Sequence, residues 1–384
     1  MILATVLATL LSLPSPAGSG AAEPHLAARA DGTVVMSWLE QGVLKFAWLK
    51  NGRWSTPRTI PAKELFVNWA DFPSIVDDGH GVLFAHWLQK SGKGTYAYDV
   101  WITSSSDDGK TWRKPLLVNR DGKQAEHGFV SFAPLPAGGV ALAWLDGREM
   151  KAAEHGGHSG HGGHEGSMTL RYAEVDAALK LRDESMLDAR VCECCGTAMA
   201  MTSHGPLVAY RDRSGEEVRD IAFTRRSGGK WSNPARVRVD NWKIPGCPVN
   251  GPQVDARGDR AALAWFTAAS DKPQVQVAFS RDAGATFGRA VRVDRGNAAG
   301  RVDVLLLNDG SALVTWIEGA ADNAGIFARR VSPDGKLEEP VKLAATSSAR
   351  ASGFPRAALA GTTAYFAWTD PATKTVKVQS LSVR

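Results

Sequence analysis

The sequence predicts an all-β fold, a β-propeller of four-stranded blades, and two observations predict it. A short apolar strand ending in an aromatic residue recurs at intervals of roughly 50 residues, a period that suits a four-stranded blade and is too long for the common helical solenoids. The segments between these copies are short apolar runs bounded by turn residues, a pattern typical of strands. Both observations predict very little helix.

The repeated aromatic position gives the number of blades. Seven copies are visible, at Trp38, Trp87, Trp144, Tyr210, Trp265, Trp316 and Trp368, separated by 49, 57, 66, 55, 51 and 52 residues. They predict seven blades, and six remain possible if the incomplete first and last units merge to close the ring. Large rings at this position are expected to fill the wedge between blades.

The composition excludes several classes of protein. Apolar residues make up 44% of the 384 residues and charged residues 22%, which is ordinary for a globular protein with a core. The 45 basic and 40 acidic residues are spread without a long Lys/Arg run, so no nucleic-acid partner is expected. No apolar stretch is long enough to span a membrane.

The N-terminus predicts export. Met1 to Leu13 is almost wholly apolar, and small residues follow from Ala17 to Ala22, so residues 1–22 are predicted to form a signal peptide. No Lys or Arg precedes Arg29, so the usual positive start is missing, and the alternative is an ordinary first strand. Residues 23–384 are then one propeller domain of a periplasmic or secreted protein.

Two segments carry the Asp-box pattern, Ser-x-Asp-x-Gly-x-Thr-aromatic, at residues 105–112 and 280–287. In this box the Asp accepts backbone N–H bonds, the Gly supplies a positive φ and the aromatic ring packs inward. Together with the repeats, the boxes make the chain resemble the sialidase (bacterial neuraminidase repeat) superfamily of propellers over essentially its whole mature length. The resemblance specifies the fold and says little about the chemistry.

The same resemblance implies a catalytic set. Sialidases hold a carboxylate with three arginines, use a Tyr activated by a Glu as nucleophile, and use an Asp as acid and base. Arg211, Arg301, Arg356 and Asp71 match the arginine and Asp roles. The early chain lacks an Arg-Ile-Pro motif, and no Tyr stands in a convincing nucleophile position. An exo-sialidase-type glycoside hydrolase is therefore an alternative function.

Propeller topology predicts which residues share a face. The segment that enters each blade and the loop after its second strand are expected at the same end of the ring. That end receives Cys192, Cys194, Cys195, Cys247 and His127 from entry segments. Thiolates and imidazole form a soft ligand set for copper or zinc, whereas disulfides are equally compatible with cysteines in an exported protein.

A His-rich insertion at residues 150–168 accounts for the longest spacing between repeats. Histidines recur there every three residues among Gly and Ser, at His155, His158, His161 and His164. Such tracts capture metal ions, although a flexible loop can also bind them incidentally. The favoured function is an exported propeller that binds a soft transition metal, copper first. A further alternative is a module that binds a glycan or a periplasmic protein. Trp69, Trp242 and Phe354 are the aromatic residues available to stack on a sugar, and packing between blades is the other interpretation of these rings.

Overall fold

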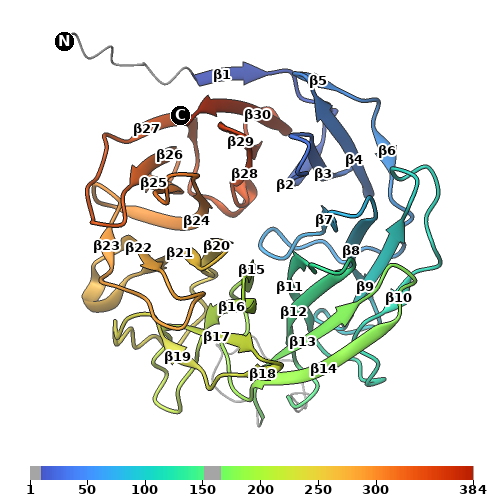
Figure 1. Cartoon of the computed structure of the whole chain (residues 1–384), viewed down its shortest axis with the longest axis horizontal. Helices are drawn as coiled ribbons and strands as arrows, with labels where there is room; N and C mark the ends of the chain where they lie inside the picture. Colours follow the sequence, from blue (N-terminus) through green and yellow to red (C-terminus); the bar gives the residue numbers. More distant parts are fainter. Residues whose placement is uncertain (1–9, 151–165, 384) are drawn as a thin grey trace.

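The computed structural model describes residues 10–150 and 166–383, and these residues form seven antiparallel sheets arranged as blades around a central channel (Figure 1). The all-β prediction and the count of seven blades are confirmed, and the six-blade alternative is excluded. Helix within the described residues is limited to two short 3₁₀ turns, η1 (Ala269–Asp271) and η2 (Arg350–Ser352). In this part of the chain no helix has the length and apolar character to cross a membrane.

Each blade is a meander that begins at the channel and moves outward. Blade 1 contains β2 (Ala21–Ala28), β3 (Val34–Glu40), β4 (Val43–Lys50), β5 (Arg53–Trp54) and β6 (Arg58–Thr59). Blade 2 contains β7 (Ser74–Asp77), β8 (Leu83–Lys90), β9 (Tyr98–Ser105) and β10 (Leu116–Leu117). Blade 3 contains β11 (His127–Pro134), β12 (Val140–Asp146), β13 (Thr169–Val175) and β14 (Leu181–Asp188).

The remaining blades repeat this order. Blade 4 contains β15 (Ala198–Thr202), β16 (Gly205–Arg211), β17 (Ile221–Ser227), β18 (Lys230–Trp231) and β19 (Ala235–Arg236). Blade 5 contains β20 (Gln253–Arg257), β21 (Arg260–Thr267), β22 (Gln274–Ser280) and β23 (Val291–Arg292). Blade 6 contains β24 (Ala298–Leu306), β25 (Ala312–Ala320), β26 (Asn323–Val331) and β27 (Val341–Thr346). Blade 7 contains β28 (Arg356–Ala360), β29 (Thr363–Asp370) and β30 (Thr375–Ser382).

The two ends of the chain meet in blade 7. Its outermost strand is β1 (Leu10–Leu13), which pairs antiparallel with β30, the last strand of the chain (Figure 1). Strand β1 and the first two residues of β2 fall within the segment predicted as a signal peptide. That segment therefore contributes to the sheet in this structure, and its removal as a leader stays a prediction.

The repeated aromatic residues lie on the second strand of each blade and are buried. Five of the seven are tryptophans with less than 2% of their surface exposed: Trp38, Trp87, Trp144, Trp265 and Trp316. The indole N–H of Trp144 donates to Asp146 Oδ2 at 2.8 Å, and that of Trp316 donates to Glu318 Oε2 at 2.7 Å. The polar residue two positions after the aromatic thus satisfies a buried indole, which explains why both recur together.

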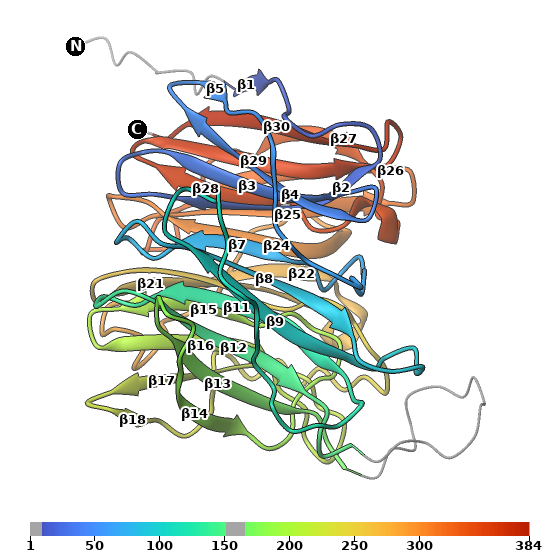
Figure 2. The same cartoon turned by 90° about the vertical axis from the view of Figure 1, so that its right-hand side faces the viewer.

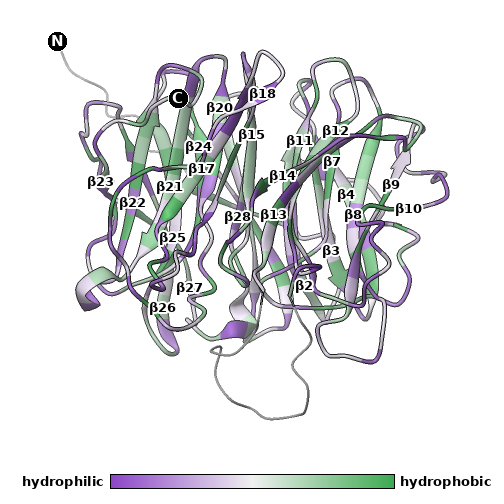
Figure 3. Cartoon of the chain, turned by 90° about the horizontal axis from the view of Figure 1, so that it is seen from below, coloured by the Kyte–Doolittle hydropathy of each residue, from purple (hydrophilic) through white to green (hydrophobic). Residues whose placement is uncertain are grey.

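The two faces of the ring carry different features. Figure 2 shows the strands running from one face to the other, and Figure 3 shows apolar residues along the strands and polar residues in many of the loops. Because the strands of a blade alternate in direction, the segments before first strands and the loops after second strands share one end, which we call the upper rim. The loops after third strands lie at the other end, the lower rim.

The Asp boxes are turns of the lower rim, between β9 and β10 and between β22 and β23. In the first box Asp107 Oδ1 accepts the backbone N–H of Thr111 at 2.9 Å. Gly109 has φ +76°, and a Cβ there would lie 2.3 Å from Cζ of Phe46 in blade 1. The box therefore needs glycine both for its backbone and for its close contact with the preceding blade.

Candidate functional site

All four cysteines of the chain meet at the upper rim. Cys192, Cys194 and Cys195 lie in the loop before β15, and Cys247 lies in the loop before β20. Cys194 and Cys247 form a disulfide, with 6.0 Å between their Cα atoms. Cys192 Sγ lies 3.6 Å from Cys195 Sγ and 4.0 Å from Cys194 Sγ. The predicted convergence of sulfur atoms from two blades is therefore present, as one disulfide beside two free thiols.

The two pairs of sulfurs differ in their access to solvent. Cys192 is 0% exposed and Cys195 is 1% exposed, whereas Cys194 and Cys247 are half-buried. The free thiols are thus buried, whereas the disulfide is partly accessible to solvent. We refer to these four residues as the sulfur cluster.

Close backbone packing brings the two loops together. A Cβ on Gly251 would lie 2.0 Å from the carbonyl oxygen of Gly196, so only glycine permits this approach. The backbone N–H of Asn250 donates to Cys195 Sγ at 3.4 Å. On the other side, the backbone N–H of Cys192 donates to the carbonyl of Arg211 at the end of β16 at 3.0 Å. The cluster is therefore held by blades 4 and 5 together.

A buried arginine faces the inner thiol. Arg219 Nη1 lies 3.2 Å from Cys192 Sγ and 3.0 Å from Glu193 Oε2, and Nη2 lies 2.8 Å from Glu217 Oε2. Burial opposes ionisation of Cys192, but hydrogen bonding with Cys195 and the charge of Arg219 outweigh it and lower the pKa of Cys192 to about 6. Burial raises the pKa of Cys195 well above its ordinary value. The thiolate form is therefore favoured at Cys192 and the thiol form at Cys195.

His127, predicted as a ligand beside the cysteines, lies among carboxylates instead. Its Nε2 is 3.1 Å from Asp121 Oδ2 and 3.7 Å from Asp146 Oδ1, and its Nδ1 is 3.4 Å from Asp99 Oδ1. Arg148 also binds Asp146, at 2.7 Å. Burial alone would lower the pKa of His127, but the carboxylates raise it overall. His127, Asp121 and Asp146 are close enough to hold a metal ion, as a group separate from the sulfur cluster.

The other predicted ligands, His155, His158, His161 and His164, lie outside the described residues. The described residues on either side of them, Met150 and Gly166, lie between β12 and β13 of blade 3, next to the blade of Cys192.

Two of the three predicted arginines are engaged by the main chain. Arg211 is 1% exposed and donates to the carbonyls of Asn250, Phe266 and Arg219 at 2.7–3.1 Å. Arg301 donates to three further carbonyls, those of Ser348, Ala349 and Gly353. Arg356 lies in the central channel, with its guanidinium 4.6 Å from the ring of Phe72. Arg211 and Arg301 therefore join neighbouring blades and have little capacity left for a substrate carboxylate.

Asp71 belongs to a cluster that the sequence did not reveal. The hydroxyl of Tyr98 donates to Glu126 Oε1 at 2.7 Å, and Asp71 also interacts with Tyr98. Burial raises the pKa of Asp71 well above its ordinary value. Tyr98 is fully buried and stacks on Phe66 at 3.9 Å. Glu126 could have been predicted as a site residue, because it stands in an entry segment next to His127. Tyr98 could not, because no residue around Tyr98 in the sequence distinguishes it from other strand residues.

The aromatic residues considered for glycan binding pack within the protein. Trp69 stacks on Phe354 at 5.7 Å, and the guanidinium of Arg301 lies 4.9 Å from the Trp69 ring. Trp242 is 7% exposed and contacts Phe266 edge to face at 5.7 Å. Packing within the protein therefore explains the presence of Trp69, Trp242 and Phe354 at these positions.

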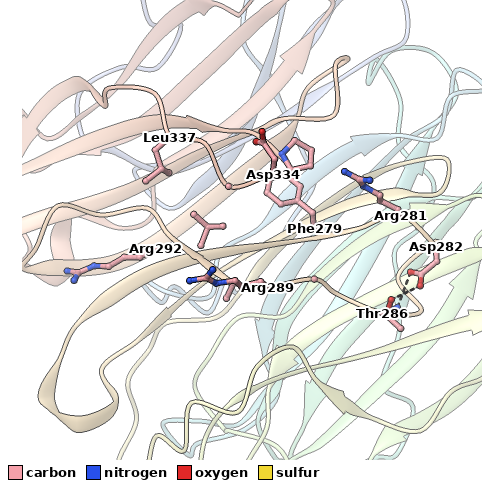
Figure 4. Close-up of a pocket in the computed structure, with 13 residues that line it drawn as sticks. Phe279, Arg281, Asp282, Thr286, Arg289, Arg292, Asp334 and Leu337 are labelled. Carbon is pink, nitrogen blue, oxygen red and sulfur yellow. Dashed lines mark hydrogen bonds between the residues drawn. The ribbon is translucent and has the colours of Figure 1, made fainter.

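Two cavities lie away from the sulfur cluster. One of about 310 Å³ occupies the central channel and is lined by all seven innermost strands, including His25, Asp255 and Asp303. A larger one, of about 740 Å³, lies beside the second Asp box, where Figure 4 shows Arg281, Arg289, Arg292 and Asp334 around it. Asp282 at its edge is committed to the turn, because its Oδ2 accepts the hydroxyl of Thr286 at 2.6 Å.

Comparison with known proteins supports the fold. No protein-family model matches the chain, and no curated protein matches it. Among solved structures, an α-L-arabinofuranosidase from Fusarium graminearum is 11% identical with a TM-score of 0.54, and the match covers 98% of this chain and 97% of that one. The polysaccharide lyase Uly1 is 10% identical with a TM-score of 0.54, covering 94% of this chain and 90% of that one.

The chain has a seven-bladed propeller fold similar to that of the arabinanase and arabinofuranosidase structures. A protein of unknown function from Dyadobacter fermentans matches over 99% of this chain and 98% of its own length, at 14% identity and a TM-score of 0.52. At such identities the likeness establishes the fold, and the function has to come from the residues of the site.

Proposed function

We propose that this protein is an exported propeller that binds a soft transition metal at the upper rim, with copper(I) as the preferred ion. The observation that carries the proposal is the meeting of four sulfur atoms from two blades. Thiolate sulfur selects copper(I) and zinc over harder ions. The export, the compartment and the identity of the metal are parts of this proposal.

The charges around the cluster favour copper(I) over zinc. With the Cys194–Cys247 disulfide intact, Cys192 and Cys195 are the two thiolate ligands of the cluster. Copper(I) with two thiolates carries one negative charge, which the adjacent Arg219 guanidinium offsets. Structural zinc sites use four ligands, so zinc would need additional donors such as Glu193 or the reduced Cys194 and Cys247.

The His-rich insertion has a different proposed role. Its imidazoles are separated by Gly and Ser, which favour capture of ions over one fixed coordination geometry. We assign to His155, His158, His161 and His164 the collection of ions for the sulfur cluster in the neighbouring blade.

A competition titration tests the proposal. The oxygen-free protein, without added reductant, is titrated with copper(I) in the presence of a coloured copper(I) chelator. The wild type is expected to withdraw one copper per chain, and Cys192→Ser is expected to lose at least 100-fold in affinity. His204→Ala, which changes an exposed histidine outside the cluster, serves as the matched control and should titrate like the wild type. A wild type that withdraws no copper contradicts the proposal.

Glycoside hydrolysis is the second candidate, favoured by the cluster of Asp71, Tyr98 and Glu126. These residue types match the acid, nucleophile and activating Glu that the sialidase resemblance implies. The cluster is packed closely, however, because a Cβ on Gly128 would lie 2.1 Å from Asp71 Oδ2 and 2.9 Å from Tyr98 Cε2. A fluorogenic sialoside distinguishes the candidates: turnover that is lost in Tyr98→Phe but kept when all four cysteines are replaced would favour the hydrolase.

A further inference from the structure

The sulfur cluster combines a disulfide with two thiols, and this combination can react within itself. Cys192 Sγ lies 4.0 Å from Cys194 Sγ, a disulfide sulfur, and 3.6 Å from the free Cys195 Sγ. The Sγ of Cys247, the other disulfide sulfur, is within 4.8 Å of Cys192 Sγ. Thiol–disulfide exchange starts from a thiolate close to a disulfide sulfur and proceeds with the three sulfurs in line. Cys192 Sγ lies beside the Cys194–Cys247 bond, so the exchange also requires the loop that carries Cys192 and Cys194 to turn.

We propose that the disulfide of the cluster migrates from the half-exposed pair, Cys194–Cys247, to the buried pair, Cys192–Cys195. In the first step Cys192 thiolate attacks Cys194 Sγ, the Cys194–Cys247 bond breaks, and Cys247 leaves as a thiolate. In the second step Cys195 thiolate attacks Cys192 Sγ, the Cys192–Cys194 bond breaks, and Cys194 leaves as a thiolate. One disulfide and two thiols are present before and after, so no oxidant or reductant is consumed, and the protons lost by one pair are taken up by the other.

The surroundings of the cluster favour this exchange. The three clustered cysteines lie in a segment of turns and bends before β15, which is not held in a strand ladder. Arg219 Nη1, 3.2 Å from Cys192 Sγ, places a positive charge beside the attacking sulfur. Cys194 and Cys247, the leaving sulfurs, are half-buried and can be solvated when they separate.

The exchange would change which sulfurs a metal ion can reach. Before migration the free thiols are buried, and after it they are the half-exposed Cys194 and Cys247. Migration would therefore offer an incoming metal ion two half-exposed thiols in place of the two buried ones. This consequence rests on the proposed function, whereas the exchange itself does not.

Differential alkylation tests the exchange without any metal. Native protein in a chelating buffer, with no reductant or oxidant, is incubated with N-ethylmaleimide, quenched in acid at successive times and mapped by mass spectrometry. Label is expected to accumulate on Cys194 and Cys247 in equal amounts, together with a Cys192–Cys195 disulfide. Label confined to Cys192 and Cys195, or an unlabelled protein with Cys194–Cys247 intact after prolonged incubation, would overturn the proposal.

Two variants that keep the starting disulfide locate the steps. In Cys195→Ser the exchange is expected to stop after the first step, with label on Cys247 and a Cys192–Cys194 disulfide. In Cys192→Ser neither Cys194 nor Cys247 should become labelled, and label there would contradict the route. No metal is present in this experiment, so it tests the migration separately from copper binding. The migration can fail while the titration shows copper binding, and the titration can fail while the migration is observed.

Discussion

The Asp-box turns of the lower rim and the sulfur cluster of the upper rim are built in opposite ways. Within the first box, the bonds of Asp107 join it to Ser105, Lys110 and Thr111, all within four residues. Around the sulfur cluster, Cys192 meets Arg219, 27 residues away, and Cys195 meets Asn250, 55 residues away. The box is therefore encoded locally, whereas the cluster exists only when blades 4 and 5 are packed together.

The largest expected effect comes from the disulfide at the upper rim. Cys247→Ser opens a cross-link between residues 53 positions apart, and chain-entropy arguments give a loss of about 4 kcal/mol in the free energy of unfolding. The denaturant midpoint, measured against the wild type at unchanged slope, checks this value. A loss below about 1 kcal/mol would mean that the packing of the two blades, and not the cross-link, holds the cluster.

The next effect comes from Arg211, which ties blade 4 to blade 5. Arg211→Met leaves the carbonyls of Asn250, Phe266 and Arg219 without their donor, and we expect a loss of about 3 kcal/mol. The exposed Arg257→Met, in which one surface hydrogen bond is lost, is the matched control and should cost less than about 0.5 kcal/mol. Equal midpoints for the two variants would show that Arg211 has no structural role.

This contrast explains what could be predicted from the sequence. The Asp boxes and the Trp positions were visible because each is defined by neighbours within a few residues, such as Trp144 and Asp146. The meeting of Cys192 with Cys247 followed from counting strands, because strand direction alone decides the face. The pairing of the cysteines, the Arg219 contact and the placement of His127 among carboxylates depend on side-chain packing between blades, which no local pattern encodes.

A smaller effect is expected at the lower rim. Burial acts to raise the pKa of Asp282, but hydrogen bonds from the hydroxyl and N–H of Thr286 and from the hydroxyl of Ser280 outweigh it and lower this pKa to about 2. The stability that this carboxylate contributes is present above pH 4 and is lost as the pH falls through about 2. Asp282→Ala should cost about 1 kcal/mol at pH 7, because solvent screens this exposed turn. The destabilisation caused by Asp107→Ala should be additive with that caused by Asp282→Ala, because the two boxes belong to separate blades. Thermal unfolding of the single and double variants at several pH values tests both statements.

At the upper rim, the dependence of stability on pH is expected to have the opposite sign. Burial, followed by the charge of Glu193, raises the pKa of Glu126 to about 7 despite the hydrogen bond from Tyr98. Because the pKa of Glu126 is higher in the folded than in the unfolded protein, its protonation stabilises the folded state. This stability is present below about pH 4.5 and is lost as the pH rises through 7. Glu126→Gln should weaken the dependence of the unfolding midpoint on pH between pH 5 and 7.5. An unchanged dependence on pH would mean that another group is responsible for it.

The central claim is that the upper rim binds a soft metal through sulfur, and X-ray absorption at the copper edge tests it most directly. Protein loaded with one equivalent of copper(I) is expected to show a first shell made of sulfur, and that shell should be lost in Cys192→Ser. A first shell of nitrogen and oxygen, unchanged in the variant, would place copper away from the cysteines and contradict the account.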